Sequence, residues 1–164
     1  MTDSENPRQH LLGLLKKFDT AMLITHASDG GWHGRPMAIA SIEDSGEMYF
    51  STSLSSPKVK ELAADAEVMV TLQSAGRFAT IQGMTEIVRD RAEIDRLWSE
   101  AWRVWFPGGK ADPSLCLIRL HARHAEYWDR AGAKGLAFAF EAAKAVAKGV
   151  TPKLGKDVNA KVEL

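Results

Sequence analysis

The sequence predicts a mainly β protein with peripheral helices, in which six or seven antiparallel strands form a closed or nearly closed barrel. Two observations support this fold class. First, short stretches recur along the chain in which apolar residues either alternate with polar ones or follow one another without a break, as in half-buried and fully buried strands. Second, most neighbouring stretches are joined by turns that are too short to contain a crossover helix. The sequence shows neither repeated βαβ units nor internal repeats. A closed barrel would also hide the strand edges.

Length and composition indicate one folded domain. The chain has 164 residues, which is enough for a substantial core, and its 45% apolar and 26% charged residues fit neither a disordered nor a membrane-embedded protein. Residues 1–10 are polar and are expected to form a flexible N-terminus. Residues 11–164 are expected to form a single domain that ends in a helix and a strand.

Charge and cysteine content limit the function classes. The formal net charge is zero, whereas nucleic-acid-binding proteins usually carry a basic excess, so we expect no nucleic-acid partner. No apolar run approaches the roughly 20 residues of a membrane span, and the N-terminus lacks the features of a signal peptide. Cys116 has no second cysteine to pair with. We therefore expect a cytoplasmic protein in which Cys116 is a buried strand residue.

In the first half of the chain, apolar spacing predicts a short amphipathic helix over residues 11–18. Asp29-Gly30 and the segment 43–46 are turn signals that separate three strands. Ser56 is a suitable N-cap for the next helix, and Pro57 fits its first turn. The predicted strands of this half cover residues 21–27, 32–42 and 47–52.

In the second half, Asp90 and Glu93 resemble a capping box at the start of a helix. That helix is expected to bury Ile94, Leu97, Trp98 and Ala101 and to carry Trp98, Trp102 and Trp105 on one face. Gly83 lies inside a long strand and predicts a bulge or kink. Strands are predicted over residues 67–74, 77–89, 115–128 and 158–164, and a helix over residues 137–148.

The most informative stretch is a strand that runs into a loop rich in hydroxyl groups and ends in Lys58 at the start of a helix. The dipole and free N–H groups of a helix N-terminus favour an anion, and Lys58 adds a positive charge. This pattern indicates a phosphate site. The alternative is a serine-rich turn with a solvated lysine. The hydroxyl groups belong to Ser51, Thr52, Ser53, Ser55 and Ser56.

The segment Arg35-Pro36-Met37 is the second candidate. Pro36 has no N–H, so its strand should be an edge or bulged there, which leaves backbone groups for a ligand. Arg35 could clamp a phosphate, or it could be a surface arginine beside a bulge. Trp105 and Phe106 precede Pro-Gly-Gly, where their rings could lie against a flat ligand or a partner subunit.

Other chemistries find little support in the residue pattern. No histidine, cysteine or carboxylate spacing completes a metal site. The sequence has neither a Gly-x-Ser-x-Gly elbow nor a Gly-x-Gly-x-x-Gly fingerprint. We identify no catalytic residue.

Together, Arg-Pro-Met, Tyr-Phe-Ser-Thr-Ser, Ser-Pro-Lys-Val-Lys-Glu-Leu, Trp-Phe-Pro-Gly-Gly and Ala-Glu-Tyr-Trp-Asp resemble a known family. It is the pyridoxamine 5′-phosphate oxidase-like family of FMN-binding split barrels, and within it the bacterial general stress protein 26 group. The resemblance covers about residues 10–130. It implies a six-stranded antiparallel split β-barrel and a homodimer with FMN between the subunits.

By position, the resemblance implies a set of cofactor-binding residues. Arg35, Pro36 and Met37 would line the flavin, Ser51 and Thr52 would touch the flavin or its phosphate, and Lys58 would pair with the phosphate. Strand residues Arg77 and Phe78 would approach the cofactor, and Trp128 would flank the site. Trp105 and Phe106 would come from the partner subunit.

The chain departs from the true oxidases of the family. Pro57 replaces the arginine that usually precedes the phosphate lysine, Phe78 stands where a glutamine is usual, and the basic C-terminal motif is not recognisable. These differences argue against pyridoxamine 5′-phosphate oxidation. The expectation is a flavin-dependent oxidoreductase of unknown substrate and redox partner. Alternatives are a non-catalytic flavin-binding stress-response module, or a barrel that binds FAD, haem or a deazaflavin.

Overall fold

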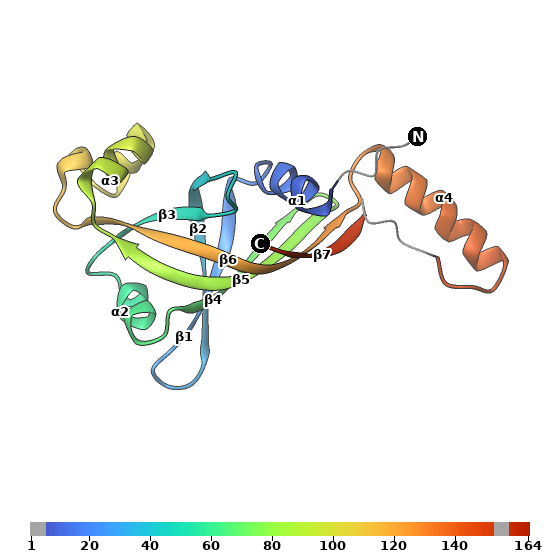
Figure 1. Ribbon diagram of the computed structural model, residues 1–164, viewed down its shortest axis with the longest axis horizontal. Coiled ribbons are helices and arrows are strands. Elements are labelled where there is room, and N and C mark those ends of the chain that lie inside the picture. The colour runs from blue at the N-terminus through green and yellow to red at the C-terminus, as the bar shows by residue number, and fades with distance from the viewer. Residues whose placement is uncertain (1–5, 153–157) are drawn as a thin grey trace.

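The computed structural model describes residues 6–152 and 158–164, which form one antiparallel sheet of seven strands with helices around it (Figure 1). The spatial order of the strands is β3-β2-β1-β4-β5-β6-β7. The strands are β1 (Thr20–His26), β2 (Trp32–Ile42), β3 (Met48–Ser53), β4 (Glu67–Ser74), β5 (Arg77–Val88), β6 (Leu115–Asp129) and β7 (Asn159–Glu163). The helices are α1 (Pro7–Leu15), α2 (Pro57–Ala64), α3 (Arg91–Leu97) and α4 (Ala133–Ala147), with short 3₁₀ helices η1 (Glu100–Val104) and η2 (Gly109–Ala111).

The long strand β6 closes the barrel and also splits it. One edge of β6 pairs with β5 from Leu117 to Asp129. The other edge pairs first with β3, from Leu115 to Leu120, and then with β7, from His124 to Trp128. Strands β1 to β6 therefore form a closed ring, and β7 extends the sheet beyond it. The predicted six-stranded antiparallel split barrel is confirmed.

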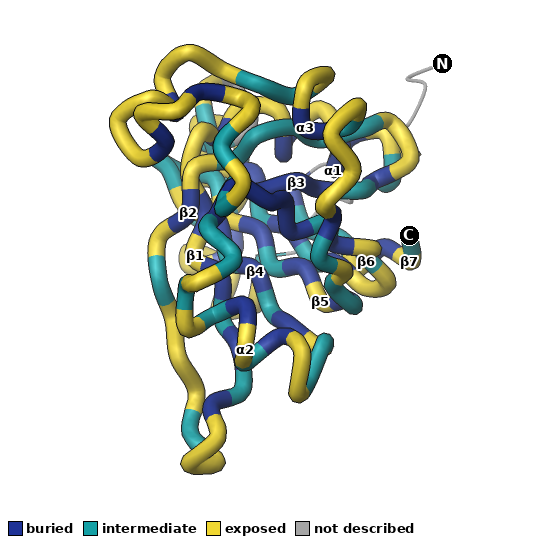
Figure 2. The backbone as a smooth tube through the Cα atoms, turned by 90° about the vertical axis from the view of Figure 1, so that its left-hand side faces the viewer, coloured by how far each residue is buried: buried dark blue, intermediate teal, exposed yellow. Residues whose placement is uncertain are grey.

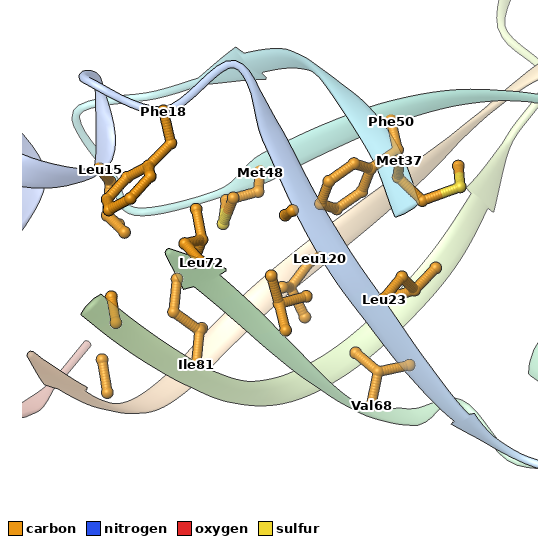
Figure 3. Close-up of a cluster of buried hydrophobic side chains, with 14 of the residues drawn as sticks. Leu15, Phe18, Leu23, Met37, Met48, Phe50, Val68, Leu72, Ile81 and Leu120 are labelled. Carbon is orange, nitrogen blue, oxygen red and sulfur yellow. The ribbon is translucent and has the colours of Figure 1, made fainter. Parts of the chain in front are cut away.

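The main core fills the barrel and is covered at one side by α1. The inward-facing side chains come from strands and from the end of α1, and Figure 3 shows Leu15, Phe18, Met48, Leu72 and Ile81 converging on the same space. Figure 2 shows that buried positions gather along the central strands, whereas most exposed positions lie in the loops and helices around them. Each fully buried leucine or isoleucine stabilises the fold by roughly 1.5–3 kcal/mol. None of the helices in the described ranges is long and apolar enough to cross a membrane.

A second, smaller core lies outside the barrel under α3 and η1, and it changes one prediction. The predicted single helix ends at Leu97, because Trp98 adopts an extended backbone and Ser99 starts a new turn by accepting a hydrogen bond from the Ala101 N–H. Trp98 and Trp102 pack edge to face at 5.6 Å. The prediction of one helix face carrying three tryptophans was therefore wrong, and Ala101 is exposed.

The other element boundaries follow local capping chemistry. Helix α1 begins at Pro7 rather than at residue 11, because Asn6 accepts a hydrogen bond from the Arg8 N–H at 3.0 Å. Asp90 caps α3 in the same way through the Ala92 N–H. Helix α4 begins at Ala133, earlier than expected. The predicted strands all occur, with ends that shift by at most one residue.

Gly83 causes the predicted bulge. The pairing of β5 with β6 shifts register between Gln82 and Gly83. A Cβ atom at Gly83 would lie 2.1 Å from the backbone oxygen of His121, which is far inside contact distance. The long strands β5 and β6 can approach each other this closely only because residue 83 has no side chain.

We predict that Gly83→Ala lowers the free energy of unfolding by at least about 2 kcal/mol, because the clash is with backbone rather than with a movable side chain. Chemical denaturation would measure the loss. Gly13→Ala is the matched control: Gly13 lies in α1 with no atom near its Cβ position, so it should be neutral or stabilising by up to about 1 kcal/mol. If Gly83→Ala were as stable as wild type, β5 and β6 would be able to move apart at the bulge without cost, which would contradict this prediction.

Candidate cofactor site

A cavity opens where β2 and β3 diverge. Among the described residues, β2 pairs with β3 only from Ile39 to Ile42, whereas β3 continues along β6 to Ser53. The β2 backbone around Pro36 therefore has a strand partner only on the β1 side, where it faces Met22. This confirms the predicted strand edge at Pro36.

The cavity has a volume of about 450 Å³ and gathers most of the predicted cofactor-binding residues. Its lining combines the free edge of β2, the end of β3, the start of α2 and the loop after η1. Seven of the predicted residues lie here: Pro36, Met37, Ser51, Thr52, Lys58, Trp105 and Phe106. Ala38, Ser53 and Ser56 complete the lining, and these were not assigned from the resemblance.

Lys58 is held at this cavity by hydroxyl groups. Its Nζ donates hydrogen bonds to Thr52 Oγ1 at 3.1 Å and to Ser56 Oγ at 2.6 Å. Ser56 precedes α2 as predicted, but its side chain accepts from Lys58 and does not cap the helix. Burial, and then the nearby charge of Arg35, hold the pKa of Lys58 below its usual value. A bound anion would offset both effects, so this end of the cavity suits a phosphate.

Arg35 lies beside the cavity in a polar network that the sequence reasoning missed. Its guanidinium donates to Thr25 Oγ1 at 2.5 Å and to Glu61 Oε2 at 2.6 Å. Glu61 also accepts from Thr25 at 2.6 Å and contacts His33 Nδ1 at 2.7 Å. A signal was present, because Lys58 and Glu61 are three residues apart on α2 and so project to one side of it.

Glu61 is the electrostatic centre of this network. Burial alone would raise the pKa of Glu61, but hydrogen bonds from Thr25, His33 and Arg35, with the charge of Arg35, lower it to about 2. Glu61 is therefore ionised at neutral pH and balances Arg35. This leaves Lys58 as the cation without an ion-pair partner among the described residues that line the cavity.

Trp105 and Phe106 line the cavity from the same chain as Lys58. The resemblance assigned them to a partner subunit; within one chain they already lie at this cavity. Phe106 is buried in the smaller core, whereas Trp105 is 76% exposed at the cavity rim. Trp105 can thus cover a flat ligand without being needed for folding.

Arg77, Phe78 and Trp128 are not brought to Lys58 within one chain. Phe78 pairs with Trp128 at one end of β6, and Thr52 pairs with Cys116 at its other end, a separation of roughly 40 Å along the strand. Phe78 and Trp128 line a different cavity of about 380 Å³. Only a second subunit could place them next to Lys58.

The described residues offer no obvious nucleophile or metal centre at the cavity. Cys116 is buried, and burial raises the pKa of its thiol to about 11. His26 and His33 do not meet across their hairpin, since His26 contacts Asp65 and His33 contacts Glu61. No group of three or more potential metal ligands occurs in the part of the chain that is described.

The sequence and the fold match a known class of proteins. Residues 6–153 match the family model described as pyridoxamine 5′-phosphate oxidase like, and the chain belongs to this family. A search of curated proteins found no match.

Several of the solved structures that are similar to this chain are general stress proteins. A protein from Jannaschia sp. CCS1 assigned as general stress protein 26 superposes with a TM-score of 0.74 at 27% identity, covering 94% of this chain and 96% of that one. The general stress FMN/FAD binding protein of Xanthomonas citri is 36% identical, with a TM-score of 0.65 and coverage of 75% and 88%. General stress protein 26 of Bacillus anthracis str. Sterne shares the fold at 20% identity, with a TM-score of 0.67 and coverage of 73% and 92%.

We predict that Glu61 makes stability depend on pH in the acid range. Because its folded pKa is about 2 and its ordinary value is 4.5, its contribution is fully present above about pH 4.5 and is lost as the pH falls toward 2. Allowing for solvent screening, that contribution is on the order of 1 kcal/mol. Denaturation of wild type and Glu61→Gln between pH 2 and 7 would show a difference that shrinks in this window.

Glu67→Gln serves as the control for this measurement, because it removes a carboxylate from an exposed strand position. Its difference from wild type should stay small across the whole pH range. A Glu61→Gln difference that does not change between pH 7 and pH 2 would contradict the proposed role of the Glu61 charge.

Proposed function

We propose that this protein binds FMN, with FAD as an alternative, in a flavin site shared between the two subunits of a homodimer. The observation that supports this best is the position of Lys58, held by Thr52 and Ser56 in the lining of a cavity that also includes the free strand edge at Pro36. The general stress FMN/FAD binding protein of Xanthomonas citri, 36% identical, gives independent support.

The residues of one chain fit the parts of such a cofactor. Lys58 and the hydroxyl groups of Ser51, Thr52 and Ser56 would hold the phosphate through charge-assisted hydrogen bonds. The free β2 edge at Pro36 and Met37 offers backbone groups to the edge of the ring system. Trp105 would cover a ring face and exclude water. Bound flavin would supply the redox chemistry, and the protein would supply orientation and charge.

A second subunit would complete the site. Arg77, Phe78 and Trp128 lie too far from Lys58 in one chain, yet Phe78 and Trp128 present aromatic surface around a second cavity. If a two-fold axis placed that surface against the Lys58 cavity of the partner, each flavin would lie between two chains. Arg35, released from or shared with Glu61, would face the ribityl chain or phosphate.

The titratable side chains in the cavity lining limit how the protein could turn over a substrate. Lys58 is the one titratable side chain among the described residues that line it, so proton transfer would depend on the flavin or the substrate. This observation favours two functions: an oxidoreductase with flavin-borne chemistry, or a flavin-binding stress-response module without turnover. Stopped-flow reduction of the bound flavin by nicotinamide donors separates them. With Pro57 and Phe78 in place of the oxidase residues, pyridoxamine 5′-phosphate should not be oxidised.

We predict that Lys58→Ala weakens FMN binding by roughly 10- to 100-fold, the effect of losing one charge-assisted hydrogen bond to phosphate. Riboflavin, which lacks the phosphate, should bind both proteins equally. Quenching of flavin fluorescence measures both affinities. The loss for FMN should shrink at high salt, because screening weakens the Lys58 contribution in wild type.

Lys60→Ala is the control, since Lys60 carries the same charge on an exposed position of the same helix. It should bind FMN like wild type. Failure of wild type to bind FMN at micromolar concentration would end the flavin proposal. The absorbance spectrum of the purified protein would then show whether haem or a deazaflavin takes its place.

A further inference from the structure

Helix α4 presents an apolar stripe that no described part of the chain covers. The stripe contains Leu136, Phe140 and Val146, which are 76%, 63% and 79% exposed. Alanines at the helical spacings between them make it continuous: Ala139, Ala143 and Ala147. The opposite face is the one that docks, since the Phe138 ring lies under the Arg130 guanidinium at 4.5 Å and Ala145 is buried. Figure 1 shows α4 projecting away from the barrel.

A second exposed apolar patch lies at the other end of the molecule. Val104 ends η1 and is 77% exposed, and Trp105 follows it at the cavity rim. In Figure 1 the α3 region, which η1 follows, and α4 occupy opposite ends of the long axis. One chain therefore cannot bring the two patches together, but two antiparallel copies can, and a two-fold axis would form the contact twice.

We propose that the α4 stripe of one subunit packs across Val104 and Trp105 of a second copy of this chain and covers the rim of its Lys58 cavity. The inference rests on the proposed function, in which Phe78 and Trp128 of the second copy meet that cavity. Helix α4 begins at Ala133, five residues after Trp128, so its start lies within roughly 17 Å of Trp128. A pairing that brings Trp128 to the flavin site would therefore place the start of α4 within roughly 17 Å of that site.

The exposed area of the two patches fits a contact between two copies of this chain. The exposed side chains of the stripe and of Val104 and Trp105 offer on the order of 700 Å² per subunit, close to the share of one partner in a standard interface. The alanines allow close approach of another chain. A membrane surface is a poorer match, because Lys144 is engaged within the helix. Its Nζ contacts Glu141 at 3.1 Å and lies 4.3 Å from the centre of the Phe140 ring.

Cross-linking of two differently tagged, co-expressed chains tests the contact. One chain carries Val104→Cys and the other Phe140→Cys, and a short bismaleimide links thiols that are close. The native Cys116 is buried with a raised pKa and should stay unreacted. We expect a mixed cross-linked dimer at least about fivefold more abundant than with Glu141→Cys, which lies on the polar side of α4.

Each other outcome overturns the inference. Absence of the mixed product would show that α4 does not reach the rim. Linkage of two Phe140→Cys chains to each other would show that α4 packs on α4. A mass of one 18.0 kDa chain in solution together with binding to anionic phospholipid vesicles would show that the stripe serves a membrane.

A charge placed in the stripe gives a second readout. Phe140→Glu should shift the species in light scattering from two chains toward one and weaken FMN binding about tenfold, while Lys148→Glu on the polar side should change neither. The tests separate this inference from the proposed function. FMN binding that depends on Lys58 without cross-linking removes the role of α4 alone, and cross-linking without FMN binding removes the flavin site alone.

Discussion

The structure depends on how β3 is shared between its two neighbours. Strand β3 pairs with β6 over its full length, from Met48 to Ser53, and this closes the ring of six strands. Its pairing with β2 stops at Phe50. A strand cannot keep straight ladders with two neighbours that diverge, so closing the barrel on the β6 side opens a gap on the β2 side. The cavity is thus a result of barrel closure, and the residues on both sides of it, Pro36 on β2 and Thr52 on β3, are set by strand register.

Charge balance at the cavity follows from the same geometry. Register places Arg35 of β2 opposite Leu23 and diagonal to Thr25 of β1, to whose Oγ1 it donates, and α2 crosses close enough for Glu61 to reach both. Glu61 offsets Arg35, while the amine of Lys58 donates to the neutral oxygens of Thr52 and Ser56 and has no ion-pair partner among the described residues that line the cavity. One cation beside the cavity is therefore paired, and one at the cavity is not. This charge balance suits the anionic ligand proposed above.

The sequence predicted the strands, and it predicted a hydroxyl loop that ends at Lys58, because both depend on local patterns. Alternating apolar residues, the Asp29-Gly30 turn and the bulge at Gly83 act within a few residues, and so does the hydroxyl loop that ends at Lys58. The network of Thr25, Arg35 and Glu61 was missed because its members lie on three elements and meet only after folding. The break at Trp98 was missed because helical periodicity does not reveal the competing cap at Ser99. Within one chain, Arg77, Phe78 and Trp128 lie far along the sheet from Lys58, and this separation is set by strand pairing that periodicity does not encode.

The position of Cys116 has a consequence for durability. Flavins that give electrons to oxygen can release hydrogen peroxide, and the single thiol of this chain pairs in the sheet with Thr52, a residue that lines the cavity. The Sγ atom points to the Thr52 carbonyl oxygen at 3.5 Å from inside the core, and its high pKa keeps it in the thiol form. Since peroxide attacks the thiolate, burial holds this thiol in its least reactive form. If the proposed flavin site forms, the single cysteine of the chain would resist a peroxide by-product released beside it.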